Sequence, residues 1–156
     1  MTQLLLLGSP HRASAEEVPC VFEPPHPVVN TTLEVVRQYQ LARPVPYTVA
    51  ERVWLRTGER VLISQSGCAP ATITYAFQLD AEPDGPLGHL AVARLERLRE
   101  VVPVGVGELA GALAASVASA PQAVSFDLVP GRERVTLSLT QTDGGPELVV
   151  AYEISQ

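Results

Sequence analysis

Hydrophobic and polar residues alternate with a period of two over much of the chain, which is the pattern of half-buried β-strands. Between residues 51 and 79 the alternation occurs in three runs. Gly58 separates the first two runs and suits the positive φ of a tight hairpin turn. Gly67 and Pro70 lie between the second and third runs, where they interrupt a strand ladder. The segment therefore predicts a β-hairpin followed by a third strand, around which we expect the rest of the chain to be organised. The hydrophobic positions of these runs are Val53, Leu55, Val61, Ile63, Ile73, Tyr75, Phe77 and Leu79.

The spacing of hydrophobic residues becomes helical in the middle of the chain. Leu90, Ala91, Leu95, Leu98 and Val102 recur at intervals of three and four, so we expect an amphipathic helix that ends before the next proline. A second, alanine-rich helix is predicted over 108–120. From residue 122 the period returns to two in three runs separated by turn sequences. Because parallel strands covered on both faces would be continuously apolar, these runs predict an antiparallel meander.

These patterns together predict an α+β fold, in which an antiparallel sheet of six or seven strands carries the two mid-chain helices on one face. Residues 16–156 are expected to form a single globular domain. Its parts are a proline-rich arm and edge strand (16–47), the hairpin plus strand (48–79), a linker (80–88), the helices (89–120) and the meander (122–155).

Two features of this prediction stay open at the level of sequence. Leu33–Leu41 matches a strand except at Arg37, and a helix is the alternative. Residues 58–64 resemble residues 132–138, which would fit a duplicated unit of three strands. Short strand patterns also converge by themselves, so the resemblance does not decide the point.

Composition narrows the class of protein. At 156 residues the chain is long enough for one domain with a substantial core. A net charge of −6 argues against a nucleic-acid partner, and no apolar run approaches the roughly 20 residues of a membrane-spanning helix. The chain has arginine but no lysine, a bias typical of a GC-rich bacterial genome. It therefore supplies neither a lysine Schiff base nor a phosphate-loop lysine.

The first fifteen residues and the two cysteines indicate export. Residues 1–15 end in Ala13-Ser14-Ala15, which resembles a signal-peptide cleavage site. They lack a positive charge before a short apolar core, which would fit a signal peptide recorded from too late a start, and a frayed N-terminus is the alternative. In an exported chain, Cys20 and Cys68 would form a disulfide worth about 3–4 kcal/mol. We therefore expect a periplasmic or secreted protein, although two unrelated cysteines in a cytosolic chain remain the other interpretation.

The residues that usually carry catalysis do not form a recognisable set. None of the three histidines, at positions 11, 26 and 89, neighbours a candidate nucleophile. The nucleophile-elbow motif and the dinucleotide-binding fingerprint are both absent from the sequence. The cysteines lack the further ligands of a zinc site. We therefore predict no catalytic residues, no metal and no cofactor, and a protein that is not an enzyme.

One group of residues favours binding. If Val53 and Leu55 face the core, then Arg52, Trp54 and Arg56 share the outer face of the sheet, and Arg134 points outward from the meander. Tryptophan and arginine dominate interface hot spots. We therefore predict an exported bacterial binding module, inhibitor-like or immunity-like, that recognises another protein or an envelope component. An ordinary solvated sheet face is the alternative for these residues, and a small apolar ligand held between helices and sheet is the alternative function.

Overall fold

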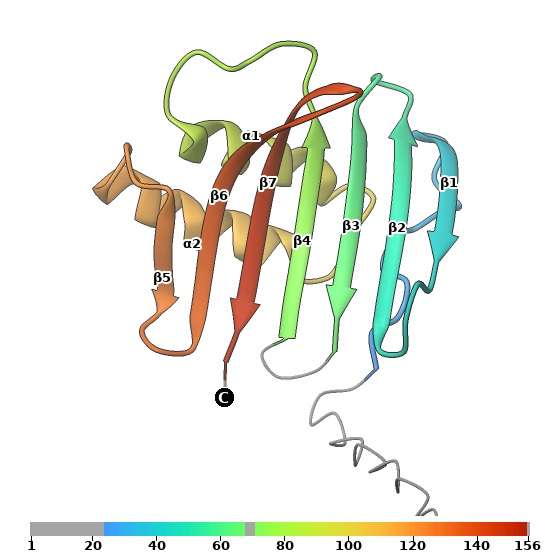
Figure 1. Ribbon diagram of the computed structural model, residues 1–156, viewed down its shortest axis with the longest axis horizontal. Coiled ribbons are helices and arrows are strands. Elements are labelled where there is room, and N and C mark those ends of the chain that lie inside the picture. Colours follow the sequence, from blue (N-terminus) through green and yellow to red (C-terminus); the bar gives the residue numbers. More distant parts are fainter. Residues whose placement is uncertain (1–23, 68–70, 156) are drawn as a thin grey trace, which may run out of the picture.

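Seven strands form one antiparallel sheet in the order β1-β2-β3-β4-β7-β6-β5 in the computed structural model, which describes residues 24–67 and 71–155 (Figure 1). The two helices follow β4 in the chain and lie together behind the sheet, which they contact. The predicted α+β fold is thereby confirmed, with seven strands. Their bounds are β1 (Val36–Ala42), β2 (Thr48–Leu55), β3 (Arg60–Ser66), β4 (Ala71–Gln78), α1 (Leu87–Leu98), α2 (Val106–Ser119), β5 (Ser125–Val129), β6 (Glu133–Thr142) and β7 (Gly145–Ile154).

The period-two residues form the core face of the sheet. Val53, Val61, Phe77 and Leu148 are partners in register across β2, β3, β4 and β7, and all four are buried. Gly58 has a φ of 90° in the turn between β2 and β3, as the hairpin requires. The core therefore lies between one face of the sheet and the two helices.

The first helix is shorter than its spacing predicts. Hydrophobic residues continue at helical intervals to Val102, but α1 ends at Leu98 and a turn follows. The backbone N–H groups of Val101 and Val102 both donate to the carbonyl oxygen of Leu98. Pro103 disfavours a helical conformation at the residue before it. Val101 and Val102 are nevertheless buried, so they keep the spacing of a helix while lying outside it.

The sheet contains two three-stranded units that meet at their last strands. β2, β3 and β4 pair consecutively, as do β5, β6 and β7, and β4 pairs with β7 at the centre. This arrangement fits the resemblance between residues 58–64 and 132–138. A common origin of the two units stays a prediction.

The segment before β1 covers the part of the core face nearest β1 and β2 (Figure 1). Val28, Val29, Leu33 and Val35 pack against the buried cluster. The N–H of Asn30 donates to the carbonyl oxygen of Val101 at 2.7 Å. This segment therefore extends the layer that the helices form. The predicted signal peptide and the predicted Cys20–Cys68 disulfide lie outside the described residues.

Candidate functional site

Within the part of the chain that the structure describes, no helix covers the face of the sheet opposite α1 and α2, which we call the open face. β2 presents Arg52 and Trp54 on it. Both residues alternate with the buried Val53 and Leu55, which fixes the side on which they emerge. In the strand register Trp54 lies opposite Arg60 of β3. Val61, the residue after Arg60, pairs with Phe77 of β4, so the row of Arg60 continues to Gln78, which pairs with Glu147 of β7.

A hollow of about 420 Å³ lies on this face, between β2 and β3 on one side and the β6–β7 hairpin on the other. We call it the open-face hollow. Its polar and aromatic lining is formed by Arg52, Trp54, Arg60, Gln78, Asp143 and Glu147.

The β6–β7 hairpin forms a wall of the hollow because it is held against β4. Its tip bends over toward β3 at the top of Figure 1. The Nε2 of Gln78 donates to the carbonyl oxygens of Gly144 and Pro146 at 2.9 and 3.1 Å. A Cβ atom on Gly144 would lie 2.8 Å from Oε1 of Gln78, so a side chain there would displace the Gln78 amide. These hydrogen bonds therefore hold the hairpin in place as a wall of the hollow.

The charged groups of the hollow are free of ion pairs within the part of the chain that the structure describes. Arg52 and Arg60 have no carboxylate within ion-pair distance there, and Asp143 and Glu147 have no guanidinium. The arginines that do pair in those regions lie elsewhere: Arg94, Arg97, Arg99 and Arg134. The hollow therefore presents charges that are available to a ligand.

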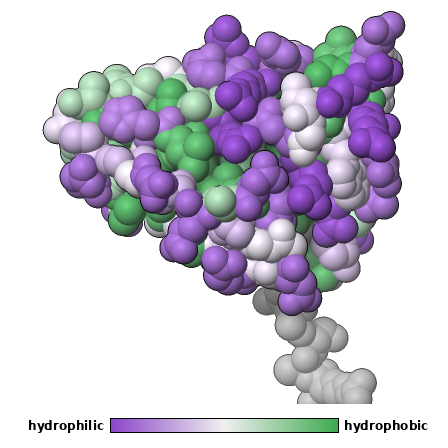
Figure 2. All heavy atoms as spheres, turned by 90° about the horizontal axis from the view of Figure 1, so that it is seen from above, coloured by the Kyte–Doolittle hydropathy of each residue, from purple (hydrophilic) through white to green (hydrophobic). Residues whose placement is uncertain are grey.

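Hydrophilic residues cover most of the surface that is seen when the molecule is viewed from above (Figure 2). Hydrophobic residues gather toward the side of β5 and α2 in the same view. Val124 and Val129, at the two ends of β5, are 50% and 39% exposed. The surface seen from above is thus mainly polar.

The four predicted binding residues do not form one group. Arg52 and Trp54 line the open-face hollow, whereas Arg56 is exposed in the turn after β2 and does not line it. Arg134 lies on the same open face but on β6, four strand spacings or about 19 Å from β2. Its Nε donates to Oδ1 of Asp127 at 2.8 Å. The binding role of all four residues stays a prediction.

Sequence reasoning missed the residues that complete the hollow, which are Arg60, Gln78, Asp143 and Glu147. Alternation did place Gln78 on the outer face of its strand. The pairing of β4 with β7 brings Glu147 beside Gln78. No local pattern in the sequence predicts that these two strands pair.

A buried carboxylate, Glu51, was also missed, although it has the same parity on β2 as Val53 and Leu55. It is fully buried and accepts hydrogen bonds from four residues. Burial, together with the hydrogen bond to Glu51, raises the pKa of Tyr39 to about 12. Glu51 therefore attaches the segment before β1 to the sheet. Its donors are the N–H groups of Val28 (2.9 and 3.1 Å) and Val29 (3.1 Å), the hydroxyl of Tyr39 (3.0 Å) and Nε2 of Gln65 (3.4 Å).

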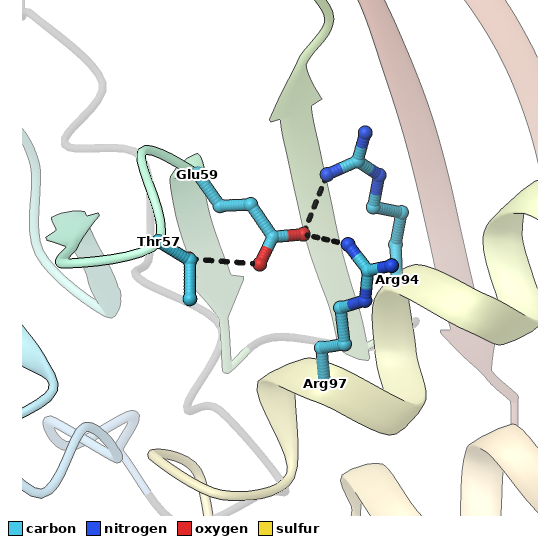
Figure 3. Close-up of polar contacts among 4 residues, drawn as sticks. All are labelled: Thr57, Glu59, Arg94 and Arg97. Atoms are coloured by element: carbon cyan, nitrogen blue, oxygen red, sulfur yellow. Dashed lines mark hydrogen bonds and ion pairs between the residues drawn. The ribbon is translucent and has the colours of Figure 1, made fainter.

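Ion pairs of Glu59 attach the β2–β3 turn to α1 (Figure 3). Glu59 accepts hydrogen bonds from Nη1 of Arg94 and, at 3.2 Å, from Nη1 of Arg97. The hydroxyl of Thr57 donates to its other oxygen at 3.1 Å. Burial acts to raise the pKa of Glu59, but the hydrogen bonds from these three residues outweigh it, so the pKa lies below its ordinary value of 4.5.

The space between helices and sheet offers little room for a ligand at the hollow lined by Ile73, Tyr75 and Leu109. Its volume is about 70 Å³, whereas ligand sites usually measure 300–1,000 Å³. Over residues 24–67 and 71–155 the structure contains no cluster of three or more potential metal ligands. Neither helix that the structure describes is long and apolar enough to cross a membrane.

Comparison with protein-family models, with curated proteins and with solved structures gives no match to this chain.

Proposed function

We propose that the protein is a binding module that recognises another protein through the open-face hollow. The observation that carries the proposal is the meeting of Trp54, the chain's single tryptophan, with two arginines that make no ion pair in the described ranges. Such residues in a concave, preformed site are typical of interface hot spots.

The proposed role is binding rather than catalysis. The cationic groups of the hollow are guanidinium groups, which stay protonated and therefore suit the recognition of carboxylates rather than proton transfer. The volume of the open-face hollow, about 420 Å³, is also about six times that of the hollow lined by Ile73, Tyr75 and Leu109, which is about 70 Å³. A site on the sheet face is thus better supported than a small-ligand site beside the helices.

Export to the periplasm or the outside of the cell belongs to the same proposal. The carbonyl oxygen of His26 accepts a hydrogen bond from Nε2 of Gln65 at 3.0 Å. His26 follows Cys20 by six residues and Gln65 precedes Cys68 by three, so this hydrogen bond joins two residues that lie near the cysteines in the sequence. This proximity supports the proposed disulfide, which an exported protein would retain.

Site-specific photo-crosslinking in cells that naturally produce the protein tests the proposed function. A photoreactive amino acid in place of Arg52 should yield a covalent adduct with a partner protein, whereas the same group in place of Thr136, which is exposed on β6, should yield little. Introducing Trp54→Ala should abolish the adduct, because it removes the aromatic wall of the hollow. Arg132→Ala, in the exposed turn between β5 and β6, serves as the matched control and should leave the adduct intact.

Two results would contradict the proposed function. Equal adducts from positions 52 and 136 would mean that the crosslinks report random encounters. Loss of the folded state in Trp54→Ala, seen by circular dichroism, would mean that Trp54 is chiefly a packing residue.

A further inference from the structure

The open-face hollow has one cationic wall and one anionic wall. Arg52 of β2 and Arg60 of β3 form the first, and Asp143 and Glu147 of the β6–β7 hairpin form the second. The two walls come from opposite halves of the sheet, so the pairing of β4 with β7 places them face to face.

The strand register gives the separation of the walls. Arg60, Gln78 and Glu147 lie on neighbouring strands in one row, so the Cα atoms of Arg60 and Glu147 are two strand spacings, or about 9.6 Å, apart. Gln78 lies between them, and its amide nitrogen is already occupied by the carbonyl oxygens of Gly144 and Pro146. The walls therefore do not neutralise each other, and the space between them is left for a ligand.

A ligand with charges of one sign would be attracted by one wall and repelled by the other. Like charges placed together across an interface weaken it, whereas complementary charges set its register. In an extended chain, residues two apart point to the same side and lie about 6.6–6.8 Å apart. An acidic and a basic side chain at that spacing fit between walls whose backbones are about 9.6 Å apart.

We propose that the open-face hollow binds an extended segment of the partner protein that carries an acidic and a basic side chain two residues apart. The acidic side chain pairs with Arg52 and Arg60, and the basic one pairs with Asp143 and Glu147. Trp54 lies beside Arg60 and packs against the segment. This inference rests on the proposed function, because it names the part of the partner that enters the hollow.

Fluorescence of Trp54 tests the inference directly, because the chain has one tryptophan and that residue lines the hollow. The probes are three synthetic pentapeptides: acetyl-Thr-Glu-Thr-Lys-Thr-amide, a version with two Glu and a version with two Lys. The mixed peptide should change the fluorescence saturably and bind at least about fivefold more tightly than either of the others. Raising the salt concentration should weaken it, since the contacts are partly exposed.

Charge reversal of either wall supplies the decisive variants. Arg60→Glu leaves Arg52 facing three carboxylates across the hollow, so the peptide with two Lys should become the tightest of the three. Glu147→Arg should shift the preference to the peptide with two Glu, and it keeps the test available if the first variant does not fold. Arg132→Glu, in the exposed turn between β5 and β6 and outside the hollow, should leave all three affinities unchanged.

The outcomes separate the inference from the proposed function. If the peptide with two Glu binds the native protein most tightly, or if no peptide changes the fluorescence, the inference is wrong. The proposed function would stand in both cases as long as Trp54→Ala still abolishes crosslinking at position 52. If the crosslink also survives Trp54→Ala, both are wrong.

Discussion

Glu51 shows how much one side chain can determine in this protein. It is fully buried and accepts hydrogen bonds from backbone and side-chain donors in three other parts of the chain. A buried carboxylate is tolerated only where donors replace its water, and here they include two consecutive N–H groups of the segment before β1. The residue therefore decides where that segment lies.

Glu51→Ala should lower the free energy of unfolding by about 3 kcal/mol, because it leaves the partly buried donors of Val28, Val29 and Tyr39 without their acceptor. Urea denaturation measures the loss. Limited proteolysis should also cut between residues 24 and 35 faster in the variant. Glu153→Ala, an exposed change on the open face, is the control and should shift stability by less than about 0.5 kcal/mol. Equal losses in both variants would contradict the role given to Glu51.

Glu59→Gln should cost about 1–2 kcal/mol at neutral pH, since it weakens charge-assisted hydrogen bonds with Arg94 and Arg97. The pKa of Glu59 is lowered in the folded protein, so its contribution to stability is present above its ordinary value of 4.5. The contribution is lost as the pH falls through the folded-state pKa.

Urea denaturation at pH 7 and pH 3 checks this pH dependence. The difference between the native protein and Glu59→Gln should shrink at the lower pH. Glu96→Gln is the matched control, because Glu96 pairs with Arg99 in an exposed i,i+3 contact that is worth less than about 1 kcal/mol. A difference that stays constant with pH would mean that the Glu59 charge does not stabilise the fold.

At the scale of elements, the two helices pack closely at one point. Gly88 in the first turn of α1 is buried against Val117 of α2. A Cβ atom on Gly88 would lie 2.7 Å from a Val117 methyl carbon, which is too close for a normal contact. Valine has little freedom at χ1, so it cannot easily turn away. Glycine at position 88 therefore sets the separation of the helices.

Gly88→Ala should destabilise the protein by about 1–2 kcal/mol, although alanine has the higher helix propensity. Gly111→Ala is the control, because Gly111 lies in α2 with no heavy atom near a Cβ there. That change should stabilise the protein by about 0.5–1 kcal/mol. A double-mutant cycle with Val117→Ala should show a favourable coupling with Gly88→Ala. Stabilisation by Gly88→Ala would contradict the close contact.

At the scale of the whole molecule, the pairing of β4 with β7 joins the two halves of the sheet. It places the β6–β7 hairpin beside the open face, where the hairpin lines one hollow together with Arg52 and Trp54 of the other half. The binding surface that we propose is therefore shared by the two halves, and neither half contains it alone.

The compartment of the whole protein is testable by intact mass. Protein taken from its native host and alkylated without reduction should begin at Glu16 and carry no alkyl group, because the proposed export removes residues 1–15 and oxidises Cys20 and Cys68. Reduction before alkylation is the control and should add two groups. A full-length chain with two alkyl groups before reduction would contradict both export and the disulfide.

The amino-acid sequence by itself determined the local elements of this protein. Periods of two and of three to four predicted six or seven strands and two helices close to where they occur, because burying one face of a strand or helix imposes that spacing on the chain. The same alternation placed Arg52 and Trp54 outward, since Val53 and Leu55 between them had to be buried.

Only the tertiary structure decided which of these elements are neighbours. The order of strands leaves Arg134 outside the hollow that Arg52 lines and brings Glu147 into it, although all of them are polar residues on amphipathic strands. In the sequence Glu51 is a polar residue at a position expected to be hydrophobic. In the structure its carboxylate holds the segment before β1 through hydrogen bonds. The physical reason is that periodicity reports which face of an element is buried, whereas pairing depends on contacts between residues far apart in sequence.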